Sequence, residues 1–357
     1  MKILLVTDAA PPQVNGVVIT LTTLAQELLH LGHEVRRITP VMFRTMPCPT
    51  YPEIRLALLP YRGVRTAILE ARPDALHIAT EGPLGIAARR VCMQLGLPFT
   101  SAYHTRFPEY VRARVPVPLR WSYAWLRRFH GAAERVMVAT ESMRAELAAH
   151  KICHTVIWSR GVDTGRFEPE GPRTFRRDQP VFMYVGRVAV EKNLRAFLDL
   201  DLPGSKWVVG GGPQLRELQK AYPAVNFAGP KPHAALAPWY RSADVFVFPS
   251  RTDTFGLVLL EALACGVPVA AFPVPGPLDV IGASGAGVLD QDLRRAALGA
   301  LRIPRSTACA HARNFSWSSA ARNFASFLSV IPGTTTGLIG MKNTSDRPEK
   351  NGLHQRF

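Results

Sequence analysis

Residues 2–39 have the sequence KILLVTDAAPPQVNGVVITLTTLAQELLHLGHEVRRIT, and this stretch decides the fold class. The apolar run Ile3–Val6 is typical of a buried strand. From Val18 to Leu31 the apolar residues recur at helical spacing, and Gly32 then ends the predicted helix. A second strand is predicted at Glu34–Thr39. The order strand, helix, strand predicts a parallel sheet with helices on both faces.

The same alternation continues along the chain and restarts in its second half. Further strands are predicted at Ala75–Ile78, Phe99–Tyr103, Arg135–Ala139, Val181–Val185, Lys206–Val209, Asn226–Ala228, Val245–Phe248 and Val267–Ala271. Between the halves, the segment around residues 161–178 is rich in proline, glycine and charge, as linkers are. We therefore expect an α/β protein with two Rossmann-like, doubly wound domains that face a central cleft.

The expected domain boundaries follow from these changes in composition and in hydrophobic pattern. They are an N-terminal domain over residues 1–160, a linker over 161–178, a C-terminal domain over 179–312, a helix over 313–331 that packs back toward the N-terminal domain, and a disordered tail over 332–357. The tail is expected to be disordered because it is polar and rich in threonine, glycine and asparagine.

The composition narrows the classes of function. The chain has 357 residues, with 43 Lys and Arg against 27 Asp and Glu, for a net charge of +16. A small disulfide scaffold, a coiled coil and a collagen-like fibre are excluded. The charge favours an anionic partner, such as a phosphorylated metabolite or an anionic membrane; the alternative is a general preference for arginine without an anionic partner. No nucleic-acid partner is expected, since no binding motif accompanies the charge.

Cysteines and apolar runs indicate the compartment. The five cysteines are scattered and form no C-x-x-C, which argues against a disulfide framework or a zinc site and fits a reducing compartment. The run Ile3–Val6 is too short for a signal peptide. The longest apolar stretch, Leu257–Phe272, is shorter than the roughly 20 residues that a bilayer requires. We expect a cytoplasmic protein whose membrane contact, if any, is peripheral, at the inner face of the cytoplasmic membrane.

Four glycine-containing turns follow predicted strands. They contain Asn15-Gly16, Gly186-Arg187, Gly210-Gly211-Gly212 and Gly276. Glycine lets backbone N–H groups approach an anion, and the following helix presents its positive end. Each turn alone could be a plain connection. Four of them at strand ends favour one ligand held between the two domains.

Charged side chains sharpen this hypothesis. Arg187 offers a planar fork and Lys192 a mobile point charge, which together would stabilise the charge on a departing diphosphate. The alternative is two ordinary surface cations. Asp253 and Glu261 follow the strand at Val245–Phe248. A carboxylate within the apolar run around Glu261 needs partners, which could be sugar or ribose hydroxyls or a buried ion pair.

Three further features have a functional and a structural interpretation. His104 follows a strand, where a side chain can point into the cleft. The segment from Arg106 to Arg135 alternates basic and aromatic residues, which suits an anionic membrane surface or an exposed amphipathic helix. Asp199-Leu200-Asp201 matches the D-x-D of some metal-dependent sugar transferases, but its place before a proline and glycine favours a turn.

Together these motifs resemble the retaining nucleotide-sugar glycosyltransferases of family 4, which have the GT-B fold. The resemblance covers residues 1 to about 330. Within the family, the chain is most similar to GDP-mannose-dependent α-mannosyltransferases and to glycosyl and sulfoquinovosyl diacylglycerol synthases. It implies a hexosyltransferase that uses GDP-mannose or a UDP-sugar, needs no metal or other cofactor, and acts on a lipid or glycan acceptor.

The resemblance also assigns roles by position. Arg187 and Lys192 would bind the donor diphosphate, Glu261 the ribose and Asp253 a sugar hydroxyl, while His104 would contact the reacting centre. The donor-binding residues implied are Gly16, Gly186, Arg187, Lys192, Gly212, Asp253, Phe255, Gly256, Leu257 and Glu261; the catalytic residues are His104, Arg187, Lys192 and Asp253; the acceptor-side residues are Asn15, His104 and Arg106.

One residue departs from the family pattern. The family's first acid is usually glutamate, and Asp253 is shorter by one methylene, about 1.5 Å. The identity of the sugar is therefore open, with a UDP-sugar-dependent diacylglycerol glycosyltransferase as the alternative. A dinucleotide-dependent oxidoreductase is disfavoured, because residues 8–12 lack the G-x-G-x-x-G that should follow the first strand. A non-catalytic sugar-nucleotide-binding protein would share the fold but need neither the cations nor the acids.

Overall fold

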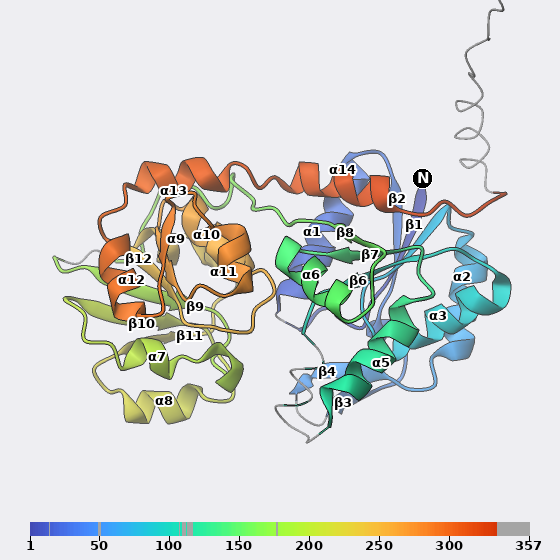
Figure 1. Ribbon diagram of the computed structural model, residues 1–357, viewed down its shortest axis with the longest axis horizontal. Coiled ribbons are helices and arrows are strands. Elements are labelled where there is room, and N and C mark those ends of the chain that lie inside the picture. The colour runs from blue at the N-terminus through green and yellow to red at the C-terminus, as the bar shows by residue number, and fades with distance from the viewer. Residues whose placement is uncertain are drawn as a thin grey trace, which may run out of the picture.

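The structure is a computed structural model that describes residues 1–333, apart from residues 14, 49–50, 107, 109–111, 113–116 and 176–177. It has two lobes, each built on a six-stranded parallel sheet with helices on both faces (Figure 1). This confirms the predicted α/β class with two Rossmann-like halves.

The first lobe has the strand order β2-β1-β5-β6-β7-β8. Its strands are β1 (Lys2–Val6), β2 (Glu34–Ile38), β5 (Ala75–Ile78), β6 (Thr100–Tyr103), β7 (Arg135–Val138) and β8 (Thr155–Ile157). Its helices are α1 (Gly16–His30), α2 (Tyr61–Ala71), α3 (Pro83–Leu95), α5 (Leu119–His130) and α6 (Glu141–Ala149). A short helix η1 (Pro40–Met42) and an antiparallel pair, β3 (Thr45–Cys48) and β4 (Tyr51–Ala57), were not expected from the sequence.

Strand β1 shows why its sequence is apolar throughout. Successive side chains of a strand point to opposite faces of the sheet. Leu4 and Val6 join the core that includes buried residues of α2 and α3, while Ile3 and Leu5 join the core on the other face, with residues of α1. All four are at most 2% exposed. Both faces of this sheet are therefore buried, as a doubly wound fold requires.

The second lobe has the strand order β11-β10-β9-β12-β13-β14. Its strands are β9 (Val181–Val185), β10 (Ser205–Val209), β11 (Asn226–Gly229), β12 (Val245–Phe248), β13 (Val269–Ala271) and β14 (Gly287–Leu289). Its helices are η2 (Val190–Lys192), α7 (Arg195–Leu198), α8 (Leu215–Ala221), η3 (His233–Ala235), α9 (Ala237–Arg241), α10 (Leu257–Ala264), α11 (Pro275–Val280), α12 (Leu293–Ala300) and α13 (Arg305–Ala312).

The last helix, α14 (Trp317–Phe327), returns to the first lobe and packs on α1 (Figure 1). Ser316 caps it by accepting a hydrogen bond from the Ser319 amide. Phe324 is fully buried in the first lobe's core, and the Trp158 indole donates to the Ala320 carbonyl at 3.1 Å. Of the tail expected to be disordered, residues 334–357 lie outside the described residues.

The strand orders create a crevice in each sheet. The chain leaves β1 toward β2 on one side and later adds β5 on the other, and it treats β9, β10 and β12 in the same way. Ligands of doubly wound sheets bind where the strand order reverses, beyond the carboxyl ends of the strands. In the second lobe this place lies between the loop after β9 and the loop after β12.

Candidate active site

The crevice of the second sheet brings two predicted site residues together. Lys192 ends η2 after β9, Asp253 lies in the loop after β12, and the two form an ion pair. Each side chain is 18% exposed, so the pair is shielded yet reachable from solvent. The second carboxylate oxygen of Asp253 is buried and has no hydrogen-bond partner in the described part of the chain. The pair therefore presents an ammonium group beside an unused acceptor.

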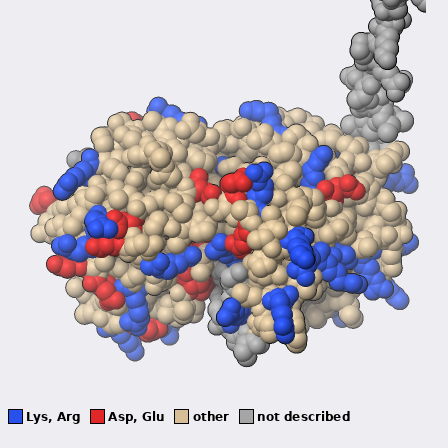
Figure 2. All heavy atoms as spheres, viewed as in Figure 1, with Lys and Arg blue, Asp and Glu red and all other residues tan. Residues whose placement is uncertain are grey.

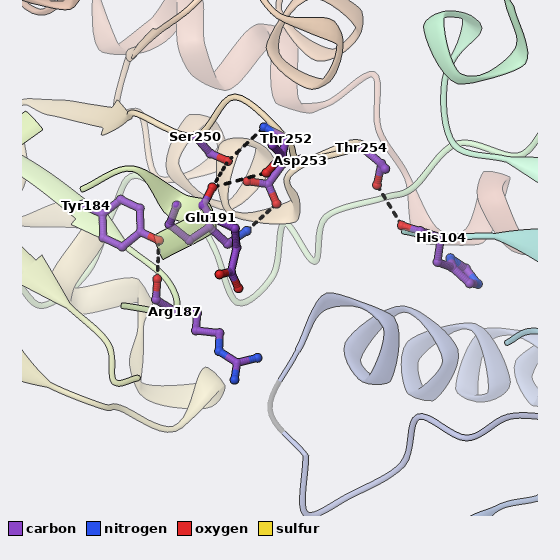
Figure 3. A network of polar contacts seen from close by, with 9 residues as sticks. His104, Tyr184, Arg187, Glu191, Ser250, Thr252, Asp253 and Thr254 are labelled. Carbon is purple, nitrogen blue, oxygen red and sulfur yellow. Dashed lines mark hydrogen bonds and ion pairs between the residues drawn. The ribbon is translucent and has the colours of Figure 1, made fainter. Parts of the chain in front are cut away.

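Backbone contacts hold these two loops against each other. The Glu191 carbonyl accepts from the hydroxyls of Thr252 and Ser250, at 3.3 and 3.5 Å (Figure 3). The side-chain amide of Asn193 donates to the Pro249 carbonyl at 3.1 Å. Sequence reasoning missed these residues, because small polar side chains in loops carry no distinguishing pattern. Their effect is to fix the ion pair on a rigid base.

Arg187 lies on the loop after β9, which also leads to Lys192. The Tyr184 hydroxyl donates to its carbonyl at 2.8 Å, which ties the loop to the strand that precedes it. Figure 3 shows the guanidinium of Arg187 extending out of the second lobe, on the side where the first lobe lies. The predicted cations thus come from one loop, and Arg187 points across the space between the lobes.

The predicted glycines have a packing role that the sequence did not reveal. A Cβ added at Gly210 would lie 1.8 Å from the Gly186 carbonyl oxygen, and one at Gly212 would lie 2.3 Å from that of Val188. Both glycines also have positive φ, at 147° and 156°. The loops after β9 and β10 therefore interlock backbone to backbone. Their glycines are required by this close approach, whether or not a ligand is bound.

Helix α10 begins at the same crevice. Gly256 precedes it with φ of 86°, and no side chain caps its first turn. The preceding residue, Phe255, is 6% exposed and packs in the core of the second lobe. The first N–H groups of α10, at Leu257 and Val258, therefore start a helix whose positive end lies in the loop that carries Asp253.

Glu261 lies one turn further into α10 and is 5% exposed. Its carboxylate oxygens accept from the His233 ring and the Tyr240 hydroxyl, both at 2.8 Å. Burial and the charge of Glu261 raise the pKa of Tyr240 well above its ordinary value, so the tyrosine stays protonated and donates. Glu261 thus has protein partners, as expected if it were a buried carboxylate with a structural role. Each of its oxygens can still accept a second hydrogen bond.

A pocket of about 390 Å³ gives Glu261 access to the space between the lobes. The second lobe contributes Glu261, Leu257 and His233, and helix α1 closes the opposite side. The remaining lining residues come from the segments 161–167 and 316–318, where the chain crosses between lobes. The satisfied carboxylate is therefore also a wall of a cavity large enough for part of a ligand.

The start of α1 faces α10 across this space. Asn15 caps α1, since its side-chain oxygen accepts from the amides of Val17 and Val18 at 3.1 and 3.0 Å. A Cβ at Gly16 would lie 3.7 Å from the Leu257 side chain of the other lobe. The predicted residues Asn15 and Gly16 therefore lie at the interlobe boundary, where Asn15 has a structural task of its own.

His104 also lies at this boundary, but its ring does not face the ion pair. Its backbone carbonyl accepts from the Thr254 hydroxyl of the second lobe at 2.9 Å, while its ring points the other way (Figure 3). The ring lies against Arg160, whose guanidinium donates to Nδ1 at 3.1 Å, and edge-on to Trp158. The His104 carbonyl therefore contacts the second lobe, while its imidazole is held by Arg160 at the boundary between the lobes.

Arg106, predicted on the acceptor side, is paired within the first lobe. It forms an ion pair with Glu146 of α6, which also accepts from the Tyr123 hydroxyl at 2.9 Å. Beyond it, the predicted basic and aromatic segment is described only in part, and Arg114 lies outside the described residues. In α5, Tyr123 and Phe129 are buried in the core, whereas Trp121 is 63% exposed.

The described residues hold no cluster of three or more metal-ligating side chains. Asp199 of the D-x-D motif caps the end of α7 and accepts from the Tyr222 hydroxyl at 2.5 Å. The first-lobe crevice holds a carboxylate that sequence reasoning passed over: Asp8, which accepts from Thr80 at 2.9 Å and from the Leu84 amide at the start of α3. Over the same described residues, no helix is both long and apolar enough to cross a bilayer.

Comparisons with known proteins agree with this geometry. Residues 14–166 match the model for Glycosyltransferase Family 4, and residues 179–302 match that for Glycosyl transferases group 1. The chain is 32% identical over 319 residues to a GDP-mannose-dependent alpha-mannosyltransferase of Mycolicibacterium smegmatis, covering 81% of this chain and 84% of that protein. It is 28% identical over 346 residues to an alpha-monoglucosyldiacylglycerol synthase of Streptococcus pneumoniae, covering 84% and 78%.

A solved structure shows the same fold. The sucrose-phosphate synthase of Thermosynechococcus elongatus matches with a TM-score of 0.71 at 21% identity, over 91% of this chain and 97% of that one. The match spans both lobes, so the likeness extends to the two-domain arrangement as well as to the single Rossmann-like unit.

Proposed function

This chain belongs to family 4 of the glycosyltransferases and has the GT-B fold, and we propose that it transfers an α-mannosyl group from GDP-mannose to a lipid or glycan acceptor at a membrane surface. The observation that carries the proposal is the Lys192–Asp253 pair at the crevice of the second sheet, with Arg187 on the same loop as Lys192 and extending toward the first lobe. The donor is proposed from the GDP-mannose-dependent relative that is 32% identical to this chain over 319 residues.

The proposed reaction retains the anomeric configuration. The bond between the anomeric carbon and the diphosphate oxygen breaks, and the acceptor oxygen forms its bond to the same carbon on the same face. The acceptor hydroxyl gives its proton to the departing phosphate oxygen. Negative charge therefore builds up on the diphosphate, where Arg187, Lys192 and the uncapped start of α10 would stabilise it. This route requires no carboxylate nucleophile.

Asp253 has two tasks in this proposal. Its paired oxygen keeps Lys192 in place, and its unpartnered oxygen accepts a hydrogen bond from a hydroxyl of the donor sugar. An ammonium group has three donors, so Lys192 can hold Asp253 and a phosphate oxygen at once. The ion pair would therefore persist when the donor binds.

Glu261 is proposed to hold the ribose of the nucleotide. Tyr240 and His233 orient its carboxylate from the protein side, which leaves the remaining lone pairs for the two ribose hydroxyls. The pocket beside Glu261 supplies the space. In this proposal Glu261 therefore has both kinds of partner that the sequence left open, since protein side chains bind one side of its carboxylate and the ribose binds the other.

The membrane part of the proposal rests on the surface of the first lobe. Lys and Arg side chains gather over α3 and α5 (Figure 2), where Arg90, Arg120 and Arg128 are exposed. Trp121, Met93 and Ile86 are exposed on the same helices, at 63%, 57% and 48%. Basic residues near an anionic bilayer contribute about 1 kcal/mol each, and exposed tryptophan suits its interface.

One experiment tests the donor and the transfer together. The purified protein is incubated with GDP-mannose, UDP-glucose or UDP-glucuronate and with vesicles of diacylglycerol and anionic phospholipid, and the products are analysed for anomeric configuration. The proposal expects an α-mannosyl product from GDP-mannose alone. An α-glucosyl or glucuronosyl diacylglycerol from a UDP-sugar would establish the alternative, which the pneumococcal relative favours. Binding of a donor without transfer to any of these acceptors would favour a sugar-nucleotide-binding protein.

A further inference from the structure

Arg160 is a buried cation without an acidic partner in the described part of the chain. It is 4% exposed and lies 4.0 Å above the Trp158 ring. Its guanidinium donates to the backbone carbonyls of Trp158 and Ser159 and to Nδ1 of His104. A buried charge is unfavourable unless it is paired, and burial lowers the pKa of Arg160 to about 9. Packing alone would not select this residue here, since an apolar side chain of similar length would fill the same space.

The contact with Arg160 decides which nitrogen of His104 carries the proton. A guanidinium only donates hydrogen bonds, so Nδ1 of His104, 3.1 Å away, must accept. The proton of a neutral imidazole then sits on Nε2. That atom is buried and has no hydrogen-bond partner within the described residues. The ring is thus left with one defined donor that no protein group uses.

The surroundings keep this ring neutral. Arg160, His77 and His130 are the charged or titratable groups that act on His104, and after burial they lower its pKa well below the ordinary value. His77 is held by Thr100, and His130 is held by Ser101 and by Glu81 at 3.2 Å. The carboxylate of the cluster, Glu81, is therefore occupied by His130 and does not pair with His104 or Arg160.

We propose that Arg160 is a positioning residue that fixes His104 as the neutral Nε2–H tautomer, so that His104 donates a hydrogen bond to an oxygen of the bound substrate and does not act as a general base. The choice of a substrate oxygen rests on the proposed glycosyl transfer. The link to the site is direct, because the His104 carbonyl is bonded to Thr254, the neighbour of Asp253. Arg160 acts through His104 and need not touch the substrate.

The tautomer is tested by nitrogen-15 NMR of the full chain with labelled histidine. His104 is assigned by comparison with His104→Gln. The proposal expects the neutral Nε2–H pattern in the wild type from pH 8 down to pH 5, and a mixture of tautomers or an upward-shifted titration in Arg160→Met. A wild-type His104 that carries its proton on Nδ1, or that titrates near pH 6.5, overturns the proposal. This readout does not depend on any enzymatic activity.

A matched control separates the positioning role from simple burial. Arg241 is also a buried arginine, 5% exposed, and its guanidinium donates to the carbonyls of Pro172, Glu168 and Glu170 in the second lobe. Arg241→Met should change thermal stability without altering the His104 signals. If it changes them as Arg160→Met does, the effect is global and the proposal fails. Should Arg160→Met not fold, Arg160→Lys keeps the charge and a donor, and it must then preserve the wild-type tautomer.

Kinetics give the second arm. With GDP-mannose, Arg160→Met should lower kcat by about tenfold or more while KM changes little, as for a lost transition-state hydrogen bond. In a His104→Ala background, Arg160→Met should have no further effect on kcat. An equal loss in both backgrounds shows that Arg160 does not act through His104. Absence of transfer from every donor would instead refute the proposed function, and the NMR result would still decide the tautomer.

Discussion

Replacing Lys192 by alanine removes one cation from the place where the leaving group would gain charge. The expected effects of this change on stability and on turnover differ in size. Each side chain of the Lys192–Asp253 pair is 18% exposed, and an ion pair that solvent reaches contributes about 1 kcal/mol or less to stability. A charge aimed at a developing negative charge contributes roughly 3–4 kcal/mol to the transition state, which corresponds to about 10²–10³ in turnover.

The Lys192→Ala variant is therefore expected to melt close to the wild-type temperature and to lose about 10²–10³ of its kcat. The assay is initial-rate transfer from GDP-mannose, with thermal unfolding followed in parallel. Lys220→Ala is the matched control, because Lys220 lies exposed on α8 and should leave both quantities unchanged. A folded Lys192→Ala protein with turnover within about threefold of wild type would refute the role given to this cation.

Three further predictions follow from named contacts. Glu261→Gln keeps the shape but removes the charge held by His233 and Tyr240, and it should weaken GDP binding in calorimetry by about tenfold with little loss of turnover at saturation; unchanged affinity would remove the ribose role. Thr254→Val removes the hydroxyl that bonds the His104 carbonyl across the lobes, and it should raise KM for the donor; an unchanged KM would show that this contact between the lobes is not needed for donor binding. Burial lowers the pKa of His77 to about 3, so the unfolded chain takes up a proton below pH 6.5 that the folded chain does not. Stability from this residue is thus present above pH 6.5 and lost on acidification, and chemical denaturation of His77→Asn should show about 2 kcal/mol less decline between pH 7 and pH 5 than the wild type.

The sequence was most informative where burial is complete. The apolar runs of β1 and β9 predict strands with both faces covered, and both are buried along nearly their whole length. The antiparallel pair β3–β4 was missed because the residues of β3 are partly or fully exposed and include Pro47, which gives no alternation. The final helix was predicted over 313–331, but α14 starts at Trp317, because Ser316 provides the cap.

For the site as well, the sequence indicated some residues but not the contacts between them. Lys192 and Asp253 could be placed at strand ends from the sequence, but their ion pair depends on β9 and β12 lying side by side, which only the strand order reveals. The partners of Glu261 come from η3 and α9, and nothing in those segments marks them as partners. Arg160 is the last residue before the predicted linker, and its proposed role rests on its burial, which no local sequence pattern indicates.

The central claim, that Arg187 and Lys192 hold the donor's diphosphate, is tested most directly by calorimetry with GDP and GMP. The two ligands share the nucleoside and differ in the phosphate that these cations would contact. We expect the wild type to bind GDP at least about tenfold more tightly than GMP, and Arg187→Met and Lys192→Met to remove this difference while leaving GMP affinity unchanged. Equal affinity of the wild type for GDP and GMP, or a preference that survives in both variants, would contradict the account.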